Sequence, residues 1–364
     1  MGYQPQGETH MADVKLADVA KYANVSLATA SNVINGTRPV STKAYQQVMK
    51  AVKDLNYRPA KSINQLMRMS ERTIGVIITS VQHVFFSDVI SGIERMADKA
   101  GYTVAIYSSE DSFDREKRLI QYLAEKKVDG LLINTCCNTG NDAYIHKLAN
   151  LSHGGTRIPV ISIDKDFSEQ GVSSVYVDGY RSAYIATEYL IKRECRKIAC
   201  ISGVKRDDVT DERYRGYVDA LQTNGMEVDD RFVAHGDYSS FTGYRAFKRM
   251  LVNGSKPDGI FSFNDQMAIG AMKAANEYGL KCPENIKIVG YDNIFVASVV
   301  MPQLTTINIP RFQMGQEAFN LFLQEKDQGE NAREARKVEL LGDLIVRQST
   351  DAEAIFSTWD LERW

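Results

Sequence analysis

The strongest constraint on the fold is an alternation, beginning at Thr73, between short apolar runs and stretches with helical periodicity. The apolar runs are Ile74–Ile78, Val104–Tyr107, Gly130–Ile133, Val160–Ile163, Ile198–Ile201, Gly259–Phe263 and Ile286–Val289. The helical stretches that follow them include Asp88–Ala100, Asp114–Lys126, Tyr180–Arg193, Tyr214–Thr223 and Gln266–Tyr278. This alternation predicts parallel sheets with helices on both faces. Roughly a dozen strands are more than one open sheet holds comfortably, so we expect two lobes.

The composition excludes several classes of protein. The chain has 364 residues, 44% hydrophobic and 25% charged, which is ordinary for globular domains. No apolar run approaches the roughly 18 residues that a membrane helix needs, so no membrane partner is expected. The five cysteines are an odd count without a C-x-x-C pair, which favours a reducing compartment over a disulfide-linked secreted fold.

Charge is divided unevenly along the chain, although the overall net charge is only −2. Residues 12–69 hold nine Lys and Arg against three acidic residues, a net charge of +6, and residues 70–364 carry −7. A small basic segment ahead of an acidic body is typical of nucleic-acid binding. Judged by charge alone, an ordinary solvated basic surface is an equally good interpretation of this segment.

The basic segment has the pattern of three short helices. Leu16–Ala23 has helical spacing, and a turn then leads to Ser26, which is placed to cap a second helix over Leu27–Ile34. Ser41 is placed to cap a third helix over Thr42–Leu55. The expected small core consists of Ala20, Val25, Ala30, Val33, Val48, Val52 and Leu55. Two short helices joined by a tight turn allow the second to lie in a DNA major groove, and a generic three-helix bundle is the alternative.

The motifs of this segment resemble those of the lactose/galactose repressor family. They are Asp18-Val19-Ala20, Ala23-x-Val25-Ser26-x-x-Thr29, Val33-Ile34-Asn35 and Leu55-Asn56-Tyr57-Arg58-Pro59. The resemblance implies that Leu27, Ala28 and Asn32 read bases. It also implies phosphate contacts from Ser26, Thr29, Ser31, Asn35 and Tyr57. An Asn side chain can pair with adenine through two hydrogen bonds, whereas Leu and Ala can touch a thymine methyl group; simple packing is the alternative for Leu27 and Ala28.

The segment after Pro59 corresponds to a hinge that, in this family, folds into a short helix only on DNA. Leu66 occupies the position of the family's leucine wedge, which opens a base step in the minor groove. A short isolated helix is marginal in water, so folding on binding is physically reasonable. A plain linker is the alternative.

Further motifs extend the resemblance over about residues 14–350. They include Arg213-Tyr214-Arg215-Gly216-Tyr217, Asn264-Asp265-Gln266-Met267-Ala268 and Val289-Gly290-Tyr291-Asp292-Asn293. The resemblance implies a body like a periplasmic sugar-binding protein, with two lobes, three crossovers and a ligand between the lobes. The family's effector positions correspond to Phe85, Phe86, Asp164, Arg213, Tyr238, Asn264 and Asp292.

These residue types suit a polyol, because carboxylates, guanidinium and amide groups bind hydroxyls and aromatic rings stack on a sugar ring. Each has a structural alternative: Asp292 can cap a loop, Phe85 and Phe86 can pack in the core, and Arg213 can pair with a neighbouring acid. Two departures from the family bear on the rim of the site. His83 and Val84 stand where Asn-Pro is common, and Asp207 and Asp208 add carboxylates close to Arg213.

The fold class expected is therefore an all-α helix-turn-helix head and an α/β two-lobed body with parallel sheets. The expected divisions are the head at 12–58, the hinge at 59–72, one lobe at about 73–164 with 293–325, the other at 165–292 with 326–350, and a tail at 351–364. In the family that this chain resembles, tetramers form through a C-terminal leucine heptad repeat. The tail lacks heptads, so the resemblance implies a homodimer.

The leading hypothesis is a cytoplasmic repressor that binds a near-palindromic, double-stranded operator under the control of a small-molecule effector, most simply a carbohydrate. We expect no metal, no cofactor and no enzymatic activity, because neither a nucleotide-binding fingerprint nor a catalytic motif is visible. Control by a protein partner is the alternative within the same class. A sugar-binding transport protein is the alternative outside it, but export has no visible signal and the basic head would have no role.

Overall fold

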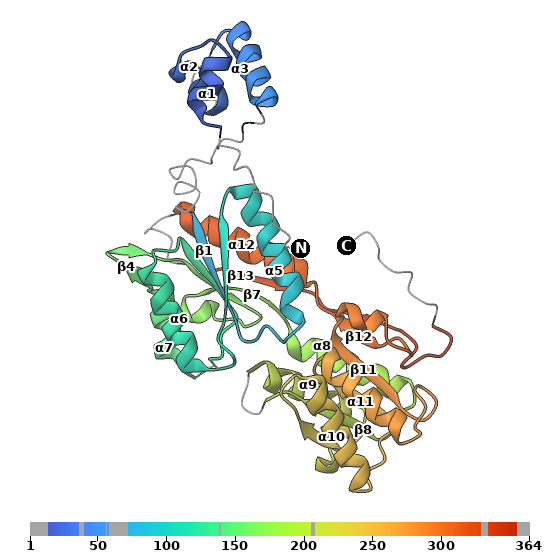
Figure 1. Ribbon diagram of the computed structural model, residues 1–364. Helices are drawn as coiled ribbons and strands as arrows, with labels where there is room; N and C mark the ends of the chain where they lie inside the picture. The colour runs from blue at the N-terminus through green and yellow to red at the C-terminus, as the bar shows by residue number, and fades with distance from the viewer. Residues whose placement is uncertain are drawn as a thin grey trace, which may run out of the picture. The chain divides into compact units, whose positions relative to one another are not determined.

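The computed structural model describes residues 14–35, 40–55, 57, 72–137, 140–204, 208–328 and 334–354, except for the side chain of Asn35. It divides into two units, Met1–Glu71 and Arg72–Trp364, which are described separately (Figure 1). Within the described ranges, no helix combines the length and the apolar character that crossing a membrane requires.

The described part of the first unit contains three helices, α1 (Leu16–Tyr22), α2 (Leu27–Asn35) and α3 (Thr42–Asp54), as the sequence predicts. Ser26 and Ser41 cap α2 and α3, because their hydroxyls accept the backbone N–H groups of Thr29 and Ala44 at 3.1 and 3.3 Å. The buried core of this unit consists of Val19, Ala20, Ala23, Ala30, Val33, Val48 and Ala51. The expected core residues Val25, Val52 and Leu55 are half-buried at its edge. Small side chains allow three short helices to approach closely.

The first lobe of the second unit is built on a parallel six-stranded sheet. In sheet order its strands are β13 (Lys337–Leu340), β7 (Ser173–Val177), β6 (Val160–Ile163), β3 (Gly130–Ile133), β1 (Thr73–Ile78) and β2 (Thr103–Ser108). Helices α5 (Phe85–Ala100) and α12 (Arg311–Gln328) cover one face, and α6 (Phe113–Glu125) and α7 (Asp142–Ala149) cover the other (Figure 1). A small hairpin, β4 (Ser152–His153) and β5 (Thr156–Arg157), lies outside the sheet.

The second lobe repeats this architecture with one antiparallel edge strand. In sheet order its strands are β14 (Asp343–Ile345), β12 (Thr305–Asn308), β11 (Lys287–Asp292), β10 (Gly259–Ser262), β8 (Ile198–Ser202) and β9 (Val233–His235). Its main helices are two packed pairs, α8 (Gly179–Lys192) with α9 (Asp208–Thr223) and α10 (Ser240–Val252) with α11 (Asp265–Glu277). The two-lobed body with parallel sheets is therefore confirmed.

The boundary expected between residues 164 and 165 is wrong. Strand β7 belongs to the first sheet, where it pairs with β6 and supplies the hydrogen-bonding partners of a fully buried strand. The chain thus enters the second lobe only after Val177. The reason for the error is that β7 begins with Ser173 and Ser174, so it lacks a continuous apolar run.

The return crossings also differ from the expected positions at 293 and 326. Strand β12 still belongs to the second sheet, beside β11, so the chain returns to the first lobe at Arg311. Strand β13 belongs to the first sheet, and only β14 completes the second. Three crossovers join the lobes, as the resemblance implies, but they follow Val177, Asn308 and Leu340.

Packing of α5 against α12 leads to a test of the fold. A methyl group added at Gly92 would lie 2.1 Å from the carbonyl oxygen of Phe312. We therefore expect Gly92→Ala to lower the free energy of unfolding by about 1–3 kcal/mol, the typical cost of overpacking. Ser91→Ala, at an exposed position of the same helix, is the control. Equal urea midpoints for the two variants would contradict this packing.

Candidate functional site

Helix α2 presents two of the predicted base-reading side chains to solvent. Leu27 is 54% exposed and Ala28 is also exposed, whereas Ala30 and Val33 are buried against the other helices. An exposed leucine on a small domain has no packing role of its own. Simple packing, the alternative interpretation of Leu27 and Ala28, is therefore not what this unit shows.

Several of the other predicted DNA contacts also make interactions within the first unit. Ser26 and Thr29 share a hydrogen bond at 2.8 Å between their hydroxyls, next to the N-terminus of α2. Ser31 and Asn32 are half-buried on the same helix, and Tyr57 packs against the core of the head. The side chain of Asn35 and all of Leu66 lie outside the described residues. All nine remain predicted DNA contacts.

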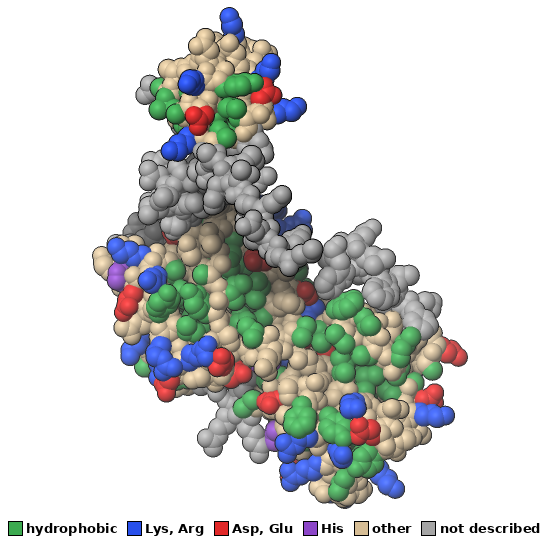
Figure 2. Space-filling model, in the orientation of Figure 1, with side chains coloured by type: hydrophobic (Ala, Val, Ile, Leu, Met, Phe, Trp, Pro, Cys, Tyr) green, Lys and Arg blue, Asp and Glu red, His purple; other side chains and the backbone are tan. Residues whose placement is uncertain are grey.

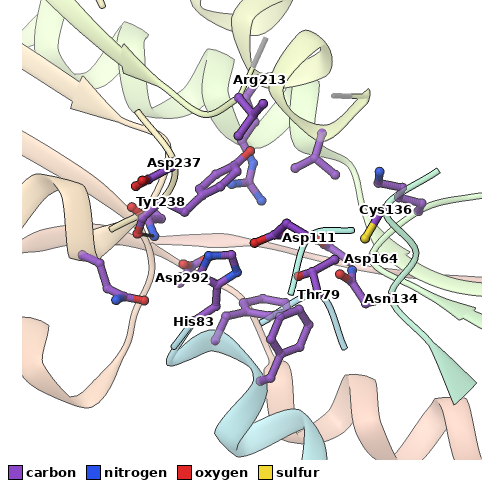
Figure 3. A pocket seen from close by; sticks show the side chains of 17 residues that line it. Thr79, His83, Asp111, Asn134, Cys136, Asp164, Arg213, Asp237, Tyr238 and Asp292 are labelled. Carbon is purple, nitrogen blue, oxygen red and sulfur yellow. Dashed lines mark hydrogen bonds between the residues drawn. The ribbon is translucent and has the colours of Figure 1, made fainter. Parts of the chain in front are cut away.

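A pocket of about 310 Å³ lies between the two lobes of the body. All seven residues predicted from the family's effector positions line it: Phe85, Phe86, Asp164, Arg213, Tyr238, Asn264 and Asp292. Strand ends and the loops after them supply most of the polar side chains, where ligands of open α/β sheets bind. In Figure 3 the side chains of Arg213, Asp237 and Tyr238 lie across the pocket from those of Thr79, Asn134 and Cys136.

Arg213 is fixed in position by the second lobe. It projects from α9, is only 4% exposed, and donates a hydrogen bond from Nη1 to the carbonyl oxygen of Phe263 at 2.5 Å. Its guanidinium carbon lies 3.7 Å from the centre of the Tyr291 ring, a cation–π contact. The guanidinium group is therefore held rigidly at the wall of the pocket.

Asp292 ends strand β11 in an unusual backbone conformation. Its φ is 109°, a region that residues other than glycine rarely adopt and that is found at functional sites. Burial raises the pKa of Asp292 well above its usual range, and the nearby Arg213 opposes that rise. A ligand that donates hydrogen bonds would favour the ionised carboxylate. Asp164 and Tyr238 also have positive φ, at 71° and 67°.

Tyr238 and Asn264 are oriented by hydrogen bonds within the second lobe. The hydroxyl of Tyr238 shares a hydrogen bond with that of Thr210 at 2.8 Å. Asn264 donates from Nδ2 to the carbonyl oxygen of Tyr238 at 2.8 Å, and its Oδ1 accepts the N–H of Met267 as the cap of α11. Asn264 thus holds the tyrosine in place as well as facing the pocket.

The pocket contains polar residues that sequence reasoning did not single out. They are Thr79, Asp111, Asn134, Cys136, Lys165, Asp237 and Gln266. Thr79 and Asn134 directly follow the apolar strands β1 and β3, which is the signal that could have found these two. Of the two carboxylates predicted for the rim, Asp208 lies outside the pocket lining, and Asp207 is outside the described residues.

A buried carboxylate positions the loop that carries Asn134 and Cys136. Glu116 of α6 accepts hydrogen bonds from the hydroxyls of Thr135 and Tyr144 and from the backbone N–H of Cys136, at 2.5–2.6 Å. These three donors satisfy a charge that would otherwise be costly to bury. Within the described ranges, no cluster of side chains suits a metal ion.

Two protein-family models match the chain. The model described as bacterial regulatory proteins, lacI family, matches residues 15–60. The model described as periplasmic binding proteins and sugar binding domain of LacI family matches residues 71–340, which is more than half of the chain. The chain belongs to the LacI family.

Relatives of this LacI-family chain match it along nearly its whole length. The HTH-type transcriptional repressor PurR of Proteus mirabilis (strain HI4320) is 35% identical over 341 residues, or 93% of this chain and 97% of that protein. The Lac repressor dimer bound to operator and the anti-inducer ONPF is 28% identical, with a TM-score of 0.74, over 93% of this chain and 99% of that one. The transcriptional regulator CelR–cellobiose complex is 27% identical, with a TM-score of 0.67, over 92% of this chain and 99% of that one.

The LacI-family assignment makes this chain a DNA-binding transcriptional repressor with a helix-turn-helix head. The named relatives regulate transcription and are not enzymes. The resemblance derived from sequence motifs is thereby confirmed.

The environment of Cys136 predicts a thiol with little reactivity. Burial raises its pKa to about 12, although the hydrogen bond with Ser109 lowers it. At pH 8 the thiol stays protonated, so iodoacetamide should leave Cys136 almost unmodified while it fully alkylates an exposed control, Gln121→Cys. Peptide mapping by mass spectrometry measures both sites, and equal rates would contradict the pocket geometry.

Proposed function

We propose that this repressor is a homodimer that binds a near-palindromic operator, and that a small polyhydroxylated molecule, a sugar or sugar derivative, controls its operator affinity from the pocket between the lobes. The observation that carries the effector proposal is the convergence of four carboxylates on that pocket: Asp111, Asp164, Asp237 and Asp292. On this proposal the protein acts in the cytoplasm, without a cofactor and without catalysing a reaction.

The chemistry of the pocket favours hydroxyl groups as ligands. Carboxylates accept hydrogen bonds from hydroxyls, and Arg213 donates to them. The rings of Phe86 and Tyr238 offer apolar faces for the C–H face of a sugar ring. Even without Asp292, whose pKa burial raises, the three carboxylates of Asp111, Asp164 and Asp237 outnumber the cations Lys165 and Arg213, which disfavours a phosphorylated or acidic sugar. The CelR–cellobiose structure, a family neighbour, supports the carbohydrate class.

The homodimer proposal rests on exposed apolar side chains of the body. In the second lobe Phe295, Val296, Val299 and Met301 are at least 40% exposed within seven residues of chain, and Met301 reaches 73%. Hydrophobic side chains gather on the visible face of both lobes in Figure 2. Such patches mark association surfaces, and a two-fold dimer would match a palindromic site.

The recognition helix is tested by Asn32→Ala. Loss of a two-bond contact with a base should weaken binding roughly 5- to 150-fold to DNA selected by the wild-type protein from a random library, measured by fluorescence anisotropy. Gln47→Ala, at an exposed position of α3, is the control and should bind like the wild type. Equal affinities for the two variants would refute base reading by Asn32.

The effector class is tested by a thermal-shift panel of neutral sugars, polyols, sugar phosphates, uronic acids and nucleobases. At about one hundred times its dissociation constant, a ligand stabilises the folded state by roughly 2.7 kcal/mol. We expect a neutral sugar or polyol to raise the melting temperature of the wild type and of Arg249→Ala, an exposed control, but not of Arg213→Ala.

A panel that stabilises nothing would contradict control by a sugar and favour control by a protein partner. A ligand-induced shift that survives in Arg213→Ala would place the effector elsewhere. The shift is compared within each variant, so any loss of stability caused by the substitution itself does not enter the comparison.

A further inference from the structure

One side chain joins the two lobes at the pocket. Gln266, in the first turn of α11 in the second lobe, accepts the backbone N–H of Val84 at its Oε1, at 3.0 Å. Its Nε2 donates to the carbonyl oxygen of Gln82 at 3.2 Å. Both partners belong to the loop between β1 and α5 of the first lobe, 182 and 184 residues away in sequence. We call this pair of hydrogen bonds the Gln266 bridge.

The chemistry of the bridge fixes the orientation of the amide. A backbone N–H can only donate and a carbonyl oxygen can only accept, so the Gln266 oxygen must face Val84 and its nitrogen must face Gln82. The same loop makes a second contact with the second lobe, because the rings of His83 and Tyr238 pack edge to face with their centres 5.9 Å apart. His83, Tyr238 and Gln266 all line the pocket.

The bridge uses a backbone N–H of the loop that leads into α5. A proline at position 84 would have no N–H to donate. Here Val84 immediately precedes α5, so its N–H is not needed by the helix and is available to Gln266. Its φ of −58° is one that proline also adopts, so a proline would fit the backbone angle but remove the donor.

We propose that Gln266 is a positioning residue that holds the loop at residues 82–84 against the second lobe, and so shifts this repressor towards a closed pocket before effector binds. The expected consequence, a higher effector affinity, rests on the proposed function. The closure of the pocket itself needs no effector. A ligand that binds the closed form binds more tightly when that form is already populated.

The expected effect is moderate, because the bonded groups lie at the solvent-exposed mouth of the pocket. Neutral hydrogen bonds of this kind contribute at the low end of the usual range, so loss of the bridge should weaken effector binding roughly two- to fivefold. Loss of the bridge acts directly on the separation of the lobes, so the distance between the lobes is the better quantity to measure.

The decisive experiment measures the distance between the lobes in the full-length, effector-free protein. Spin labels on Gln121→Cys, in α6, and Arg249→Cys, in α10, report that distance by pulsed electron–electron double resonance. Protein without the introduced cysteines gives the background from the native thiols. Val84→Pro removes the donated N–H together with the valine side chain, and Gln266→Leu removes both bonds. Val84→Ala removes the valine side chain beyond Cβ but keeps the backbone N–H, so it is the matched control.

We expect longer and broader distance distributions for Val84→Pro and Gln266→Leu, and a distribution like that of the wild type for Val84→Ala. If Val84→Pro and Gln266→Leu both give the distribution of the wild type, the bridge does not hold the lobes and the proposal is refuted. If Val84→Ala opens the lobes as much as Val84→Pro does, side-chain packing rather than the N–H is responsible, which also refutes it. Because no effector is present, failure of the sugar proposal would leave this result unaffected.

Discussion

In a parallel sheet every strand ends at the same edge, and the arrangement of the body follows from that constraint. Asp164 follows the end of β6 and Asp292 ends β11, one in each lobe, and both line a single pocket. Three chain crossings place the two sheets so that these edges supply the walls of that pocket. Polar groups that would be costly inside either sheet are thereby collected in one place, where a ligand can satisfy them.

Two buried arginines, Arg311 and Arg347, bind the segment that follows β11. Arg311, the first residue of α12, forms an ion pair with Asp88 at 2.5 Å and donates to the carbonyl oxygen of Asn293 at 2.9 Å. Arg347 donates to the side-chain oxygen of Asn293 at 2.8 Å. Burial raises the pKa of the nearby Asp265 to about 7, although hydrogen bonds and these two arginines lower it. Asn293 follows Asp292 directly, so the pocket and the connections between the lobes share one short segment.

The sequence predicted those elements whose own residues carry a clear pattern. The apolar runs at β1, β3 and β6 and the capped helices of the head have nearly the bounds that were expected. Strands β12 and β13 were not predicted, because Thr305, Thr306, Lys337 and Glu339 interrupt any apolar run. Those strands form because neighbouring strands offer unpaired backbone groups, which is information that a local pattern does not contain.

The candidate site divides in the same way. The family resemblance identified seven pocket residues, of which Arg213, Asn264 and Asp292 lie within the motifs that carry it. The Gln266 bridge could not be predicted, because it joins a side chain to backbone groups more than 180 residues away.

The central claim, that effector and operator act on one equilibrium, is tested most directly by measuring both affinities reciprocally. Operator affinity is measured with and without a saturating amount of the ligand found in the panel, and the affinity of that ligand is measured with and without saturating operator DNA. Linkage requires the two ratios to be the same factor, typically about 5- to 150-fold for coupled sites. We predict equal ratios that differ clearly from one. Ratios of one would show that the pocket binds its ligand without controlling the DNA, which would contradict the account.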